Sequence, residues 1–169
     1  MNSKGQEFEV FNVLIGAVLA IAILVIIISI INYFEQIKVD SSINAIKQKL
    51  NSAAQSPDGS IFVAKEIIVP KDYSFNSRYF GLILNINEDC IEFDIPSNTS
   101  WVEYPNFPEK NLINFNKRIQ TSFYVVCLAN NDNQKLNFHD NYPMDCPEES
   151  CNEFCCLVSF GVNPALAND

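Results

Sequence analysis

The sequence has few of the residues from which enzyme active sites are usually built. Its 169 residues include five glycines and a single histidine, His139. We find no Gly-rich phosphate-binding loop and no G-x-S-x-G nucleophile motif. His139 precedes Asp140, but a neighbouring His–Asp pair does not make a catalytic triad. We therefore expect a non-enzymatic protein with no catalytic residue and no cofactor.

Charge is missing from a long stretch near the N-terminus. From Val13 to Ile31 no residue is ionisable, and only Gly16 and Ser29 interrupt the aliphatic residues and alanines. As a helix this stretch is roughly 28 Å long, close to the hydrocarbon thickness of a bilayer. A soluble core helix of that length normally has a polar face, and this stretch has none. The pattern indicates a helix that spans a membrane or lies in the core of a filament.

The end of this stretch lacks the small-x-small step of a signal-peptidase site. The apolar run continues into Ile30-Ile31-Asn32-Tyr33-Phe34-Glu35, and it is longer than the apolar region of a secretory signal. We therefore expect the apolar helix to stay on the mature protein.

No Gly/Ser-rich or Pro-rich linker follows the apolar run. Instead Ile43, Ile46, Leu50 and Ala53 recur at three- and four-residue steps, which is typical of an amphipathic helix. The turn sequence Pro57-Asp58-Gly59 marks its end. We predict one long helix over residues 6–56, apolar in its first half and amphipathic in its second.

Beyond this turn the pattern changes to short β-like runs. Ile91 to Ile95 alternates as a half-buried strand does. The other candidate strands are Ile61–Val69, Tyr79–Ile86, Ser122–Leu128, Lys135–Phe138 and Cys156–Val162. We predict an α+β fold, in which the long N-terminal helix packs on a small antiparallel β-sheet domain, residues 57–169, held by disulfides.

The β-rich part is acidic. Residues 60–169 contain seven Lys or Arg and fifteen Asp or Glu, a net charge of −8 within the total of −9. Such a surface repels phosphate backbones, so we expect no nucleic-acid partner.

All six cysteines lie in the same part: Cys90, Cys127, Cys146, Cys151, Cys155 and Cys156. An even count beyond a hydrophobic N-terminal segment indicates disulfides in an exported domain. Four of them could in principle hold zinc or an iron–sulfur centre, but their spacing matches neither type of motif, so we expect no metal. On a strand, Cys155 and Cys156 would point to opposite faces and bond different partners. Six cysteines allow fifteen pairings, and the sequence does not choose among them.

The signals for membrane topology disagree. Lys38, Lys47 and Lys49 follow the apolar run and Lys4 alone precedes it, which favours a cytoplasmic C-terminal side. The cysteines favour the outside, and the sequon at Asn98 is compatible with glycosylation there. We give the cysteines more weight and expect an extracellular domain on a membrane anchor.

The N-terminal order of residues resembles that of archaeal type IV pilins with class III signal peptides. Lys4, Gly5 and Gln6 are followed by polar and acidic residues and then by the long aliphatic helix. The resemblance implies a leader, residues 1–5, that a prepilin peptidase removes between Gly5 and Gln6. A cut between Lys4 and Gly5 would instead make Glu9 the fifth mature residue, as in many members.

The resemblance further implies a pilin (major or minor) that moves from the membrane into a cell-surface filament of copies of itself or related pilins. Its assembly helix would carry Glu9, Asn12 and Gly16. Asn12 would hydrogen-bond between subunits there, or lie among lipid headgroups as a helix-end residue. The alternative is a membrane-anchored extracellular binding protein that never polymerises. A third possibility is an exported metal or redox module.

Overall fold

The structure is a computed structural model and describes residues 3–94, 99–103, 112–129, 151 and 154–164. One helix, α1 (Ser3–Gln55), precedes all the strands. By its contacts the chain divides into two units, Met1–Lys38 and Val39–Asp169, and the division falls inside α1. The predicted long helix is confirmed. It ends before Pro57-Asp58-Gly59, where Gly59 has a φ of +82°, which disfavours residues with a side chain.

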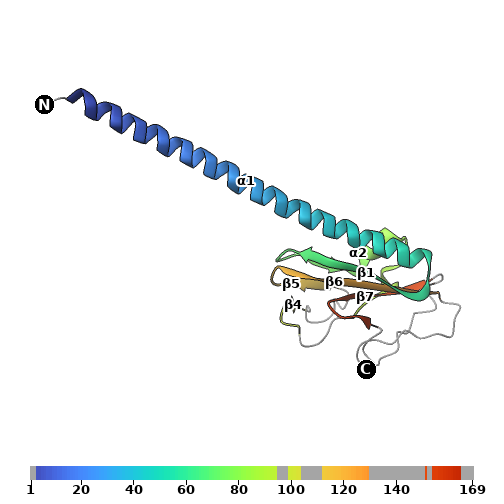
Figure 1. The fold of residues 1–169 in the computed structure, drawn as a ribbon. Coiled ribbons are helices and arrows are strands. Elements are labelled where there is room, and N and C mark those ends of the chain that lie inside the picture. The colour runs from blue at the N-terminus through green and yellow to red at the C-terminus, as the bar shows by residue number, and fades with distance from the viewer. Residues whose placement is uncertain (1–2, 95–98, 104–111, 130–150, 152–153, 165–169) are drawn as a thin grey trace. The chain divides into compact units, whose positions relative to one another are not determined.

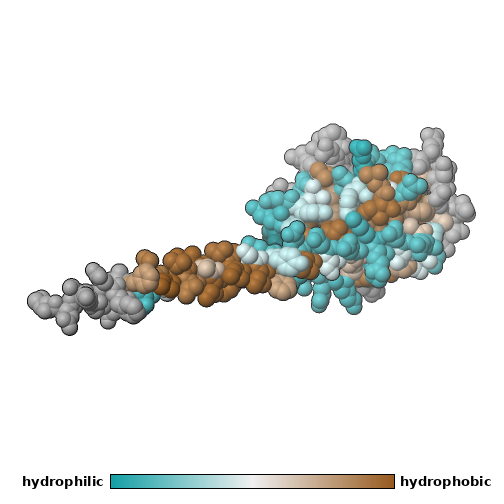
Figure 2. All heavy atoms as spheres, turned by 90° about the horizontal axis from the view of Figure 1, so that it is seen from above, coloured by the Kyte–Doolittle hydropathy of each residue, from teal (hydrophilic) through white to brown (hydrophobic). Residues whose placement is uncertain are grey.

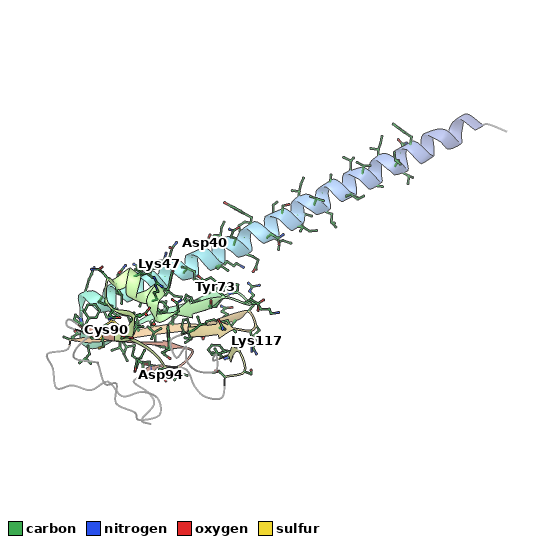
Figure 3. All side chains as sticks on the ribbon, turned by 180° about the vertical axis from the view of Figure 1, so that it is seen from behind. Asp40, Lys47, Tyr73, Cys90, Asp94 and Lys117 are labelled. Carbon is green, nitrogen blue, oxygen red and sulfur yellow. A yellow bond between two sulfur atoms is a disulfide. The ribbon has the colours of Figure 1, made fainter. Side chains whose placement is uncertain are left out.

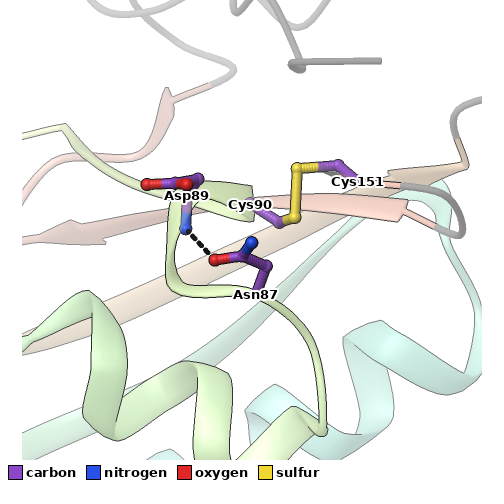
Figure 4. The surroundings of a disulfide bond; sticks show 4 residues. All are labelled: Asn87, Asp89, Cys90 and Cys151. Carbon is purple, nitrogen blue, oxygen red and sulfur yellow. Dashed lines mark hydrogen bonds between the residues drawn. A yellow bond between two sulfur atoms is a disulfide. The ribbon is translucent and has the colours of Figure 1, made fainter. Parts of the chain in front are cut away.

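The second unit is built on a four-stranded sheet in the order β1-β6-β7-β3. Its strands are β1 (Asp58–Val69), β3 (Ile91–Asp94), β6 (Ile119–Ala129) and β7 (Phe154–Phe160). A smaller sheet has the order β2-β5-β4, with β2 (Ser74–Asn76), β4 (Val102–Glu103) and β5 (Leu112–Phe115). The second half of α1 and the short helix α2 (Ser77–Leu84) lie side by side over one face of the larger sheet (Figures 1 and 4). The predicted α+β fold is thus confirmed.

One strand pair departs from the antiparallel sheet that the sequence predicts. β1 pairs with β6 and β6 with β7 in antiparallel fashion, but β3 runs parallel to β7, with Ile91 opposite Cys156. A disulfide joins Cys90 to Cys151 beside this strand pair. Each of these cysteines precedes its strand, so the bond holds the starting ends of β3 and β7 together.

The predicted strand Tyr79–Ile86 is wrong, because these residues fall in helix α2 and the turn after it. Two asparagines set the helix ends. The Asn76 side chain accepts a hydrogen bond from the Tyr79 N–H at 2.7 Å, and Asn85 adopts the left-handed conformation that ends a helix. A short apolar run fits a buried strand or a buried helix equally well. The two caps therefore determine that this run forms a helix.

The core of this unit lies between the helices and the sheets. Ile46, Leu50 and Ala53 of α1 are fully buried in it, as their spacing predicts. Phenylalanine rings from both sheets and from α2 fill its centre, including Phe75, Phe80, Phe115, Phe123 and Phe160. Phe75 and Phe123 each lie 5.3 Å from Phe160 between ring centroids. The second half of α1 is therefore part of the domain's core.

A buried hydroxyl also joins α1 to the edge strand β1. Ser42 Oγ accepts a hydrogen bond from the Ile68 N–H at 2.8 Å, next to an irregular step in the pairing of β1 between Ala64 and Ile67. Glu66 within that step has a φ of 56°. Ser42 thus supplies a hydrogen-bond acceptor to a partly buried amide of β1.

Candidate functional site

The described side chains of the first unit, from Phe11 onward, form a largely apolar helix surface that no other described element covers. Between Phe11 and Ile37 every large hydrophobic side chain is exposed, from 42% at Ile15 to 72% at Val13. Figure 2 shows this stretch as an almost unbroken apolar surface. This helix is long and apolar enough to cross a membrane, by length and composition. It is compatible with a membrane anchor, and it is the most prominent candidate site of the molecule.

The one polar side chain between Val13 and Ile31, Ser29, has a hydrogen-bond partner within its own helix. Ser29 donates its hydroxyl hydrogen to the Val25 carbonyl oxygen at 2.8 Å, one turn back in the same helix. Gly16 has no side chain, and an added Cβ there would meet no atom within 4 Å. Another helix can therefore approach the backbone closely at this position. The segment is therefore fit for lipid or for other helices.

Aromatic rings mark the C-terminal end of the apolar stretch. Tyr33 and Phe34 are 65% and 57% exposed, with their ring centroids 6.3 Å apart. Glu35 follows as the first Asp, Glu, Lys or Arg after Glu9. Aromatic side chains next to charged ones are typical of the boundary between a bilayer and water.

The structure leaves the predicted leader and assembly residues as predictions. Gly5, Gln6 and Glu9 lie within α1, and only their backbone is described. Asn12 is exposed on the helix. Asn98, the glycosylation candidate, and His139 lie outside the described residues.

The predicted disulfides are confirmed for the described cysteines. Cys90 bonds Cys151 with their Cα atoms 5.5 Å apart (Figure 4), and Cys127 bonds Cys156 directly across β6 and β7. Cys155 is also disulfide-bonded, and Cys146 lies outside the described residues.

Cys155 and Cys156 point to opposite faces of β7, as predicted. Cys156 belongs to the main core cluster beneath the helices, whereas Cys155 packs with Cys90, Cys151 and Leu157 in a second cluster. The disulfides therefore stabilise both faces of the sheet.

The described part of the chain offers little for catalysis or metal binding. Its residues include no group of three or more His, Cys, Asp or Glu side chains that could hold a metal ion. An open cavity of about 490 Å³ is lined by Lys71, Asp72, Asn114, Phe115 and Asn116, with Lys71 and Asp72 paired at 3.9 Å. These lining residues include no nucleophile next to a base, so the cavity has no catalytic arrangement.

A cluster that the sequence did not reveal joins the helices to β2. Burial raises the pKa of Tyr73 and of Tyr79, and for Tyr73 the nearby Tyr79 adds to the rise while Lys47 opposes it. Figure 3 shows Lys47 on α1 and Tyr73 on the same side of the domain. Lys47 thus lies close to the group through which α1, β2 and α2 meet.

Three comparisons place the chain against known proteins. No family model, no curated protein and no solved structure matches it.

Proposed function

We propose that the chain is a structural subunit, major or minor, of an archaeal type IV pilus-like filament at the cell surface. One observation carries this proposal. An apolar segment without a packing partner runs, within one helix, directly into a disulfide-bonded domain. The segment would hold the subunit in the membrane first and join it to other copies afterwards.

The exposed segment needs a partner from outside the chain. Soluble monomers rarely expose a contiguous apolar patch of more than a few hundred Å², and helices that are apolar all round are buried in lipid or among other helices. Lipid meets this need before assembly. In a filament, the same segments of many copies bury one another.

The second half of α1 favours a filament subunit over a loosely tethered domain. Ile46, Leu50 and Ala53 are buried in the domain's core, so this part of α1 belongs to the domain. The sequence has no flexible linker between this part and the apolar segment. A subunit packed through one part of a helix can then present its domain in a regular way. The disulfides suit an oxidising exterior.

Processing and partners follow from the same proposal. A prepilin peptidase would cut between Gly5 and Gln6 and leave the apolar segment on the subunit. The mature subunit would assemble with copies of itself or with related pilins. Its function would be assembly rather than catalysis.

The proposal is tested by locating the chain on cells. We expect antibody against the domain to label filaments in electron micrographs, and the chain to enter the sheared extracellular fraction. Ile26→Asp, which costs about 3 kcal/mol in an apolar helix centre, should abolish both signals, whereas Ile26→Leu should preserve both. Absence of labelled filaments with the wild-type chain would contradict the proposal.

A second candidate is a membrane-anchored extracellular binding protein that does not polymerise. Tyr33 and Phe34 at the end of the apolar stretch favour it, because they suit a permanent bilayer boundary. In this case the wild-type chain stays in the membrane fraction and no filament is labelled.

A further inference from the structure

The outer face of the domain's two helices differs in charge from the rest of the molecule. We name this surface the helix face: it comprises the outward side chains of α1 from Val39 to Gln55 and of α2. These two stretches contain three basic residues and one acidic residue, a net charge of +2. The remaining residues from Ser56 onward contain six basic and sixteen acidic residues, a net charge of −10. The two helical stretches are thus basic in an otherwise acidic chain.

Uncharged amides occupy the middle of the helix face. Asn44, Gln48, Asn51 and Gln55 recur at three- and four-residue steps and are all exposed, opposite the buried line that runs through Leu50. Carboxamides donate and accept hydrogen bonds without carrying a charge. Covering this stripe with another protein therefore avoids the large cost of burying unpaired ions.

The basic residues of the helix face have no carboxylate partner among the described residues. Lys47 and Lys49 flank the amide stripe and are half-buried, and Arg78 in the first turn of α2 is exposed. Figure 3 shows Asp40, the single acidic residue of the face, further along α1 from Lys47 toward the apolar segment. The positive charges are available to an external anionic group.

An apolar side chain also lies on this face. Leu82 of α2 is 76% exposed, and within the described part of Val39–Asp169 it is the one large hydrophobic residue classed as exposed. Figure 2 shows apolar residues gathered on this side of the domain. A single exposed leucine is ordinary, but Leu82 follows the exposed Arg78 by one turn of α2, where it can supply the apolar contact that an interface centre needs.

We propose that the helix face binds the acidic surface of a neighbouring copy of this chain. Among the described residues outside the two helices, this acidic surface includes the exposed carboxylates of Asp58, Glu66, Glu88 and Asp89. Their charge is complementary to that of the helix face, and every copy carries both surfaces. They are different parts of the molecule, so the contact is heterologous, and contacts of that kind repeat into open helical assemblies when they do not close into a ring. The inference rests on the proposed function and adds to it a contact between domains, beyond the apolar segment.

Zero-length carbodiimide cross-linking tests the contact on the full chain in membranes and in sheared filaments. It joins a lysine to a carboxylate that touches it. Dimer and monomer bands are digested separately, and links found only in the dimer band are links between copies. We expect Lys47 and Lys49 to be linked to carboxylates of residues 56–76 or 85–169, and the yield of these links to fall as salt is raised.

Charge reversal provides a matched pair of variants. Lys47→Glu, Lys49→Glu and Arg78→Glu together should lower the dimer yield at least about tenfold, since like charges then face each other. Lys65→Glu, Lys71→Glu and Lys117→Glu change the net charge by the same amount outside the helix face and should change the yield less than about twofold. Disulfide mapping of both variants shows that they fold.

The outcomes separate the two proposals. Dimer links dominated by Lys65, Lys71 or Lys117, or links from Lys47 and Lys49 to another protein, would overturn the helix-face contact even if filaments form. Links from Lys47 and Lys49 between copies in membranes, without filaments, would support the contact and contradict the filament. No dimer links and no filaments would overturn both.

Discussion

The two halves of α1 have similar aliphatic residues and opposite surroundings. Leu24 and Ile26 in the first half are each 58% exposed, whereas Ile46 and Leu50 in the second half are fully buried. The difference lies in the pattern of the residues between them. From Val13 to Ile31 the first half is apolar on every side, so contact on one face would leave its other sides uncovered. The second half has a narrow apolar stripe, and the sheet covers that stripe. One helix thus lies in two different environments, and the substitutions described below test each environment separately.

Loss of a disulfide should have the largest effect on the second unit. In the chain-entropy description, removal of the Cys127–Cys156 bond, which closes a loop of sequence separation 29, costs about 3 to 4 kcal/mol in the free energy of unfolding. The Cys90–Cys151 bond has a sequence separation of 61 and should cost about 0.7 kcal/mol more. Urea unfolding of the two Cys→Ser double variants measures both. Retention of the chain in membranes should stay unchanged, and its loss would show that the halves are not independent.

The same substitution in each half of the helix compares the two environments directly. Leu50→Ala removes fully buried atoms and should lower the free energy of unfolding of the domain by about 3 kcal/mol. Leu24→Ala shortens a side chain that is 58% exposed and belongs to neither described core cluster, so the domain should unfold as in the wild type. Near-ultraviolet circular dichroism in detergent, with urea, follows the domain. Equal destabilisation by both variants would refute the division.

Two serines make a finer comparison. Ser42→Ala leaves the Ile68 N–H without its acceptor and should cost about 1 to 2 kcal/mol. Ser29→Ala removes a hydroxyl that bonds only within its own turn of the helix, so the stability of the domain should not change. Hydrogen exchange of the Ile68 amide should accelerate in Ser42→Ala alone. Unchanged protection there would contradict the assigned hydrogen bond.

Alkaline pH should give the smallest effect. Tyrosines of the unfolded chain ionise near pH 10, whereas burial raises the pKa of Tyr73 and Tyr79 in the folded domain. The unfolded state therefore loses protons first, and the domain should lose stability as pH rises above about 10. The double variant Tyr73→Phe and Tyr79→Phe should flatten this dependence in thermal melts. If the stability of the double variant falls with pH as steeply as that of the wild type, groups other than these tyrosines cause the dependence.

Much of this division could be predicted from the sequence. The absence of charge from Val13 to Ile31 predicts the apolar segment, and the spacing of Ile46, Leu50 and Ala53 predicts the buried stripe, because helical periodicity is a local property. The opposite directions of Cys155 and Cys156 follow from the alternation of a strand.

Other features depend on contacts between distant residues. The parallel pairing of β3 with β7 joins residues more than sixty positions apart, and the bond between Cys90 and Cys151 beside it is one of many pairings that the sequence allows. Helix α2 depends on the caps at Asn76 and Asn85, and its apolar run alone also fits a strand. The short strands β2, β4 and β5 have too few residues to show a period.

The sequence contains the basic residues of the helix face, but it does not show that they belong to neighbouring helices. Lys47 and Lys49 belong to α1 and Arg78 belongs to α2, and the two helices are brought side by side only by the fold. Summing charge over each predicted helix would have revealed a local excess of basic residues in an acidic chain.

The intact mass of the chain in the sheared extracellular fraction tests the central claim most directly. Filament assembly through a retained apolar helix predicts a chain that begins at Gln6, keeps residues 11–37 and has its cysteines oxidised. A chain that is absent from this fraction and begins at Met1 in the membrane would contradict the account. So would an extracellular chain that has lost the apolar segment.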